Sequence, residues 1–126
     1  MKRIFTSIAL TAALTTAAAA DEKFLEGFPD VPLLEGLTEI ADERVVFDTP
    51  AGTVAQTALV SDKGADEALK RYGNTLTAFG WQCKRVARAL TCAREENKLL
   101  FKGEQTADSA ERIILRLEPN KYPDMP

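Results

Sequence analysis

The chain has 126 residues, a formal net charge of −3 and no histidine. A chain of this length builds one domain. The missing histidine removes the usual general base, the Ser-His and Cys-His pairs and the commonest metal ligand. The acidic balance argues against general nucleic-acid binding, which needs a net basic face. We therefore expect a non-enzymatic domain without a cofactor or a metal.

The N-terminus has the layout of a cleavable export signal. Lys2 and Arg3 precede an uncharged stretch, residues 4–20, which ends in four alanines. A positive start, an apolar middle and small residues at an A-x-A site are what a signal peptidase reads. We expect residues 1–20 to be the signal peptide, with cleavage between Ala20 and Asp21.

A retained membrane anchor is the alternative. The uncharged stretch is rich in Ala and Thr and falls short of the roughly 18–20 strongly apolar residues of a spanning helix. No cysteine follows it to accept a lipid. We therefore expect a mature chain of 106 residues in a bacterial periplasm, without a stable membrane span. The loss of Lys2 and Arg3 changes its formal net charge to −5.

Residues 21–43 form an acidic lead-in. Pro29 and Pro32 exclude a long helix, and we expect an extended segment that lies across the domain. The apolar residues of this segment are too many for a free tail: Phe24, Phe28, Val31, Leu33, Leu34 and Leu37. Residues 21–67 carry a charge balance of −9, and residues 68–126 carry +4. Such halves either pair within the fold or provide a docking surface.

Residues 44–119 predict a single domain that begins with a hairpin and a helix. Strands over 44–48 and 53–60 are rich in β-branched and aromatic residues and flank the turn Thr49-Pro50-Ala51-Gly52. A helix over 63–78 follows from one apolar stripe at steps of three and four: Ala65, Leu69, Tyr72, Leu76 and Phe79.

The ends of this helix have their own signals. We expect Ser61 or Asp62 to cap its N-terminus. Gly80 suits a left-handed C-terminal cap, and Trp81 is placed for the hydrophobic contact of a Schellman motif.

The sequence predicts strands for the rest of the domain. We expect them over 81–86, 89–94, 98–102 and 112–118, with a polar loop between the last two and a mobile tail over 120–126. The order strand–strand–helix–strands is typical of an α+β fold. We predict two layers, with one main helix packed on an antiparallel sheet of five to six strands.

Cys83 and Cys92 are the only cysteines. With a turn at Ala87 and Arg88 they face each other on neighbouring strands, where the Cα spacing of about 4.5–5.5 Å permits a bridge. Export supplies oxidising conditions, so we expect a structural disulfide. A redox or metal pair is the alternative, but the chain has no C-x-x-C and no second pair of ligands.

Lys84, Arg85 and Arg88 gather at the same turn. They are candidates for contact with an acidic partner or an anionic head group. The alternative is a solvated turn whose charges discourage edge-to-edge strand pairing. The acidic segment 62–67 lacks the alternating ligands of a calcium loop.

Three segments carry a resemblance: PLLEGL, VVFDTPAGTV and ALKRYGNTLTAFGW, between Pro32 and Trp81. They resemble a family of small exported proteobacterial proteins of uncharacterised function, with a Pro-rich lead-in, an FDTPxG hairpin and a helix ending in Gly-Trp. A looser similarity is to helix-on-sheet domains of accessory lipoproteins in outer-membrane protein assembly, whose lipid-acceptor cysteine this chain lacks. Such a resemblance implies a fold and names no site.

We therefore expect a periplasmic domain that binds another envelope protein through an exposed sheet face or a sheet edge. The alternative from a different class is a binder of a small apolar or anionic ligand between helix and sheet. A hydrolase that uses carboxylates is the remote alternative, because Glu95 and Glu96 are paired only in sequence and such groups must converge across a cleft.

Overall fold

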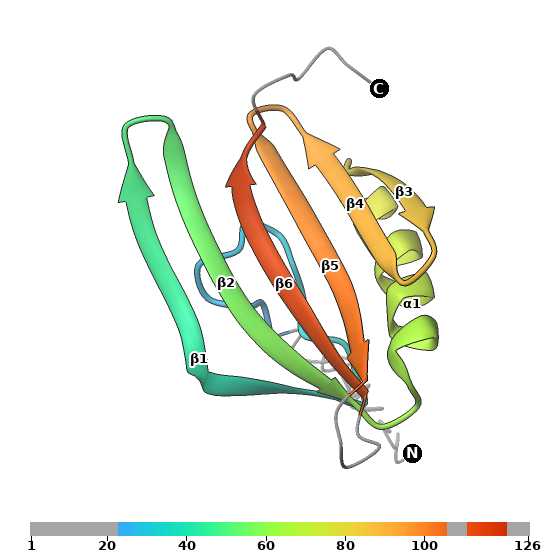
Figure 1. Cartoon of the computed structure of the whole chain (residues 1–126). Coiled ribbons are helices and arrows are strands. Elements are labelled where there is room, and N and C mark those ends of the chain that lie inside the picture. Colours follow the sequence, from blue (N-terminus) through green and yellow to red (C-terminus); the bar gives the residue numbers. More distant parts are fainter. Residues whose placement is uncertain (1–22, 106–110, 121–126) are drawn as a thin grey trace, which may run out of the picture.

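One six-stranded antiparallel sheet and one helix make up the part of the chain that the computed structural model describes, residues 23–105 and 111–120 (Figure 1). In chain order the elements are β1 (Leu37–Thr49), β2 (Gly52–Ser61), α1 (Ala65–Ala78), β3 (Gln82–Val86), β4 (Ala89–Arg94), β5 (Asn97–Gln105) and β6 (Glu111–Pro119). The strands lie in the order β1-β2-β6-β5-β4-β3. The predicted α+β class with one helix and an antiparallel sheet is confirmed. The signal peptide, its cleavage site at Ala20 and Asp21 and residues 121–126 of the tail predicted over 120–126 lie outside the described residues.

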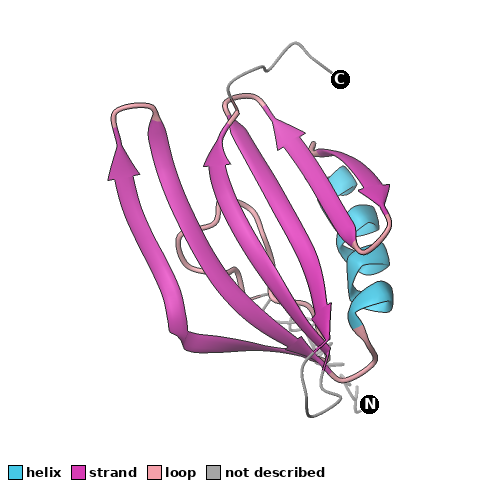
Figure 2. Ribbon diagram, viewed as in Figure 1, coloured by secondary structure: helices cyan, strands magenta, loops and turns pink. Residues whose placement is uncertain are grey.

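The helix and the lead-in lie on the same side of the sheet (Figure 2). The helix contacts β3, β4, β5 and β6, and Figure 1 shows the lead-in behind β2 and β6. The sheet face that they cover, which we call the inner face, carries apolar side chains at alternate positions, as a half-buried strand requires. On β6 these are Ile113, Leu115 and Leu117, each at most 1% exposed.

Residues 23–36 of the lead-in fold back on themselves, which differs from the predicted extended segment, whereas residues 37–43 are extended as part of β1. Phe24 and Pro32 form an isolated antiparallel bridge, and the Leu25 amide donates to the Val31 carbonyl at 2.8 Å. The Tyr72 hydroxyl of α1 donates to the Pro32 carbonyl at 2.8 Å. Burial raises the pKa of this phenol above its usual value. The loop therefore docks on the helix through a buried hydrogen bond.

The first strand begins at Leu37, well before the predicted start at Arg44. A register shift between Ile40 and Val45 interrupts its pairing with β2. Within the inner face Glu39 accepts a hydrogen bond from Thr57 at 2.7 Å and one from Arg44 at 3.1 Å. The first part of the strand, residues 37–43, was not predicted because a carboxylate points inward at this end, which hides the usual alternation of apolar and polar residues.

The helix N-terminus differs from the prediction, and its C-terminus agrees with it. Gly64 is the N-cap residue and has no side-chain cap, and the Glu111 carboxylate accepts from the Ala65 amide instead. The predicted cap residue Ser61 donates to the Gly64 carbonyl. At the other end Gly80 has φ 89°, and the Trp81 amide donates to the Leu76 carbonyl. This is the predicted Schellman motif.

Candidate functional site

The predicted cysteine pair ties the far edge of the sheet. Cys83 on β3 lies directly opposite Cys92 on β4. Their sulfur atoms are 2.02 Å apart, at disulfide distance. Cys92 is fully buried in the core beneath α1. The cysteine pair therefore lies in the packed core and has a structural role, because it joins β3 to β4.

The three basic residues of the neighbouring turn do not form one surface. Arg85 faces the helix and pairs with Asp66 at 2.8 Å. Arg88 lies 3.8 Å from the carboxylate of Glu111. Lys84 pairs with Thr91 on the opposite side of the sheet from the helix. Because Arg85 and Arg88 pair with carboxylates near the start of the helix, only Lys84 shares a surface with the candidate site described next.

The sheet face opposite the helix, which we call the outer face, is uncovered by any described residue (Figure 1). Strand registers arrange its side chains in rows. One row runs Val45, Gln56, Arg116, Leu100, Thr91 and Lys84. The next runs Ile40, Ala58, Ile114, Lys102, Ala89 and Val86. Each row therefore contains both apolar and basic side chains.

Long basic side chains lie opposite apolar ones on this face, Arg116 opposite Leu100 and Lys102 opposite Ile114. Ile114 and Leu100 are half-buried, although no element covers them. Lysine and arginine stems lie along apolar neighbours and keep their charged ends in water. A partner that displaces these stems would meet both apolar and cationic groups.

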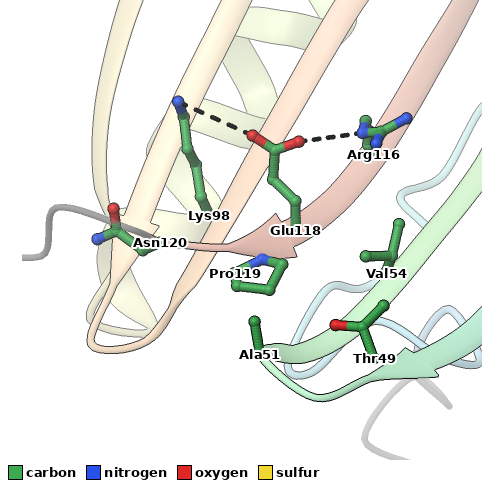
Figure 3. A pocket seen from close by; sticks show the side chains of 8 residues that line it. All are labelled: Thr49, Ala51, Val54, Lys98, Arg116, Glu118, Pro119 and Asn120. Carbon is green, nitrogen blue, oxygen red and sulfur yellow. Dashed lines mark hydrogen bonds and ion pairs between the residues drawn. The ribbon is translucent and has the colours of Figure 1, made fainter.

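A groove of about 410 Å³ lies at one end of the outer face (Figure 3). The β1–β2 turn forms one wall, and β5, β6 and the residue after β6 form the other: Thr49, Ala51, Val54, Lys98, Arg116, Glu118, Pro119 and Asn120. Glu118 stands between two cations, 3.0 Å from the Arg116 Nε and 4.0 Å from the Lys98 Nζ. The Glu118 carboxylate therefore already pairs with Arg116 and Lys98, the two cations of the groove that would otherwise hold an anionic ligand.

The expected ligand position between helix and sheet is filled with side chains. Trp81, Tyr72 and Phe101 are each at most 1% exposed, and the rings of Tyr72 and Phe101 pack 4.8 Å apart. Arg94 stacks over the Trp81 ring at 4.6 Å. The layer is packed as a protein core, so the groove described above lies on the outer face and not between helix and sheet.

The free edge of β1 is the second unusual surface. Val45, Val46 and Phe47 are 54%, 46% and 52% exposed. Val45 and Phe47 lie on the outer face, and Val46 touches the lead-in at Gly27 on the inner face. Three consecutive apolar residues leave both faces of this edge apolar, an arrangement that marks a contact surface.

Sequence reasoning missed most of this site. The residues of the groove and the outer face sit at the polar positions of amphipathic strands, where they read as ordinary solvent-facing groups: Lys98, Lys102, Arg112, Arg116 and Glu118. The sequence did contain a signal for the free edge of β1. The run of Val45, Val46 and Phe47 does not alternate, which a strand with one solvent-facing side would do.

In comparisons with known proteins, no family model, no curated protein and no solved structure matches this chain. Over residues 23–105 and 111–120, no group of three or more acidic or cysteine side chains is placed to hold a metal ion. In the same part of the chain, no helix is long and apolar enough to cross a membrane.

Proposed function

We propose that the chain is a non-enzymatic periplasmic domain that binds another protein of the cell envelope through the outer face of its sheet. The observation that carries the proposal is the uncovered outer face, with its rows of apolar and basic side chains. The export signal at the N-terminus supports the location. An exposed sheet face with mixed apolar and charged groups is typical of a protein-binding surface.

The charges of this face indicate the chemistry of the partner. It carries five cations, Lys84, Lys98, Lys102, Arg112 and Arg116, against three carboxylates, Glu43, Glu104 and Glu118. Glu118 and Glu43 are already engaged by cations of the face. The surplus positive charge favours an acidic segment with apolar side chains, since complementary potentials steer association and fix orientation.

Site-specific photocrosslinking in intact cells tests this proposal. We expect a photoreactive residue at Gln56, which is exposed on the outer face, to form one reproducible adduct with another envelope protein. The crosslinked peptide, identified by mass spectrometry, should be acidic. The matched control places the same photoreactive residue at Lys70, which is exposed on α1.

Charge reversal sharpens the same experiment. Arg116→Glu on the outer face should abolish the adduct, whereas Lys70→Glu on the helix should leave it unchanged. An adduct that forms equally from both positions, or that survives Arg116→Glu, would contradict the proposal. The absence of any adduct from Gln56 would contradict it as well.

A further inference from the structure

We infer that two copies of this chain pair through the free edges of β1, with Val46 on the two-fold axis. β1 ends the sheet on one side, and no described strand pairs with its outer edge. An unpaired strand edge with exposed apolar side chains is a template for pairing with another strand. This inference concerns a different surface from the outer face and does not depend on the proposed function.

The backbone of β1 has the right groups pointing outward. Thr49 and Gly52 close the two-residue turn to β2, and Val46 pairs with Ala55. In an antiparallel pair, hydrogen-bonded and non-bonded positions alternate. If Thr49 bonds to β2, Phe47 and Val45 do so as well, and Val46 and Asp48 direct their N–H and C=O groups to the free edge. A two-fold axis at Val46 therefore joins two residues that both have free backbone groups.

The side chains of this segment complement a second copy of themselves. The sequence from 44 to 48 is Arg-Val-Val-Phe-Asp. Antiparallel pairing about Val46 sets Arg44 opposite Asp48 of the second copy, twice. It also sets Val45 opposite Phe47 of the second copy, twice, on the outer face. Opposite charges and apolar pairs directly across two strands stabilise the pairing.

The hydrogen bonds that Arg44 and Asp48 already make do not use all their donors and acceptors. Arg44 donates to Glu26 at 2.6 Å and to Glu39 at 3.1 Å. A guanidinium has five N–H donors, so it can also serve a third carboxylate. Asp48 is exposed and accepts one hydrogen bond, from Thr53 at 2.9 Å.

Other registers are less favourable. A shift of the axis to Phe47 sets Asp48 opposite Val46 and Arg44 opposite Pro50, which has no N–H to donate. The pairing with β2 is irregular between Ile40 and Val45, where the strand bends, as Figure 1 shows, so a second copy can pair no further than Arg44. The pairing is thereby restricted to the five residues that complement one another.

Such a short contact predicts a weak dimer. Interfaces that bury less than about 1,200 Å² are typically transient. We therefore expect a concentration-dependent dimer in analytical ultracentrifugation of the purified protein between about 1 μM and about 1 mM. In the dimer the two outer faces would form one continuous surface, because the strands of both copies join a single sheet.

A charge-swap experiment tests the register. In Asp48→Lys two cations face each other twice in the homodimer, and in Arg44→Glu two carboxylates do so. Each variant alone should dissociate at least about tenfold more readily than the unchanged protein. An equimolar mixture should dimerise again, because every cross-strand pair in the heterodimer then joins opposite charges. A mixture that stays monomeric would overturn the proposed register.

A second variant guards against a folding defect in Arg44→Glu. Val46→Pro removes an N–H that points away from β2, and proline is tolerated at such edge positions. It should keep the circular dichroism spectrum of the unchanged protein and lose the dimer. The inference is overturned if Val46→Pro dimerises normally, or if the unchanged protein is monomeric throughout the concentration range.

Discussion

The sheet ends in β3 on one side and in β1 on the other, and the two edge strands are protected in different ways. β3 has five residues, is tied to β4 by the cysteine pair and lies against α1. Its middle carries Lys84 and Arg85. β1 has 13 residues and no disulfide among the described residues. The lead-in, and not the helix, lies beside it.

This difference indicates that the β3 edge is protected from pairing with another chain and that the β1 edge is available for such pairing. Short strands and charged residues are the common ways in which a sheet edge avoids pairing with another chain. β3 has both features. β1 has neither along Val45, Val46 and Phe47, where the apolar side chains are about half exposed. The predictions below test whether stability belongs to the β3 side and contact to the β1 side.

The largest expected effect comes from replacing a phenylalanine beneath the helix by alanine, and the same replacement on β1 is the matched comparison. Phe101→Ala removes a side chain that is 1% exposed and packs on Tyr72 beneath the helix. It should lower the free energy of unfolding by about 3–5 kcal/mol. Phe47→Ala on β1, where the ring is 52% exposed, should cost less than about 1 kcal/mol. Urea unfolding followed by tryptophan fluorescence measures both. Similar losses for the two variants would break the comparison.

The cysteine pair is expected to have the next largest effect. Replacing both Cys83 and Cys92 by Ala removes a tie with a sequence separation of 9. On the chain-entropy model this costs about 2–3 kcal/mol. The loss should appear as a lower urea midpoint. Amide exchange should rise in β3, and exchange at the free edge of β1 should stay as it was. An unchanged midpoint in the double variant would contradict a stabilising tie.

The β3 side is also the side that could be predicted from the sequence. The helix follows from its apolar stripe, its C-terminal cap from Gly80 and Trp81, and the pairing of the cysteines from a turn at Ala87. All three depend on local spacing, which a sequence displays directly. The agreement is therefore greatest where short-range contacts dominate.

On the β1 side the hairpin around the turn from Thr49 to Gly52 was predicted, but the other features could not be predicted in the same way. Near the start of its strand Glu39 accepts hydrogen bonds from Thr57 and Arg44, and Thr57 lies on another strand. The helix N-terminus depends on Glu111 in β6, which is remote in sequence from Ala65. Long-range polar contacts of this kind leave no periodic pattern. An exposed sheet face was expected, but most of its residues were not identified, because nothing in a sequence shows which sheet face stays uncovered.

The contact between lead-in and helix should give an intermediate effect. Tyr72→Phe leaves the buried Pro32 carbonyl without its donor at 2.8 Å, which should cost about 1–2 kcal/mol near neutral pH. Urea unfolding of the two proteins measures this loss. Full stability in the variant would mean that the lead-in is held by apolar contacts alone.

The same tyrosine predicts a dependence on alkaline pH. Because burial raises the pKa of Tyr72, the folded protein keeps the phenol neutral while the unfolded chain ionises near its ordinary value of about 10. The stability that this group contributes is fully present below that pH and is lost as the pH rises above it. Tyr72→Phe should therefore lose less stability than the unchanged protein between pH 9 and about pH 11. Parallel pH profiles would contradict a buried neutral phenol.

The smallest effect is expected at the protected edge itself. Arg85 pairs with Asp66 at 2.8 Å, and the two side chains are 36% and 71% exposed. Exposed ion pairs of this kind contribute about 0.2–1 kcal/mol at most, so Arg85→Ala should barely change the urea midpoint. Its effect should appear in association instead, because Arg85→Ala combined with Lys84→Ala removes the charges from the middle of β3. Analytical ultracentrifugation should then show a new concentration-dependent species that Val46→Pro does not abolish. If the double variant shows only the species that Val46→Pro removes, the charges of β3 do not protect this edge, and its short length and its tie to β4 are sufficient.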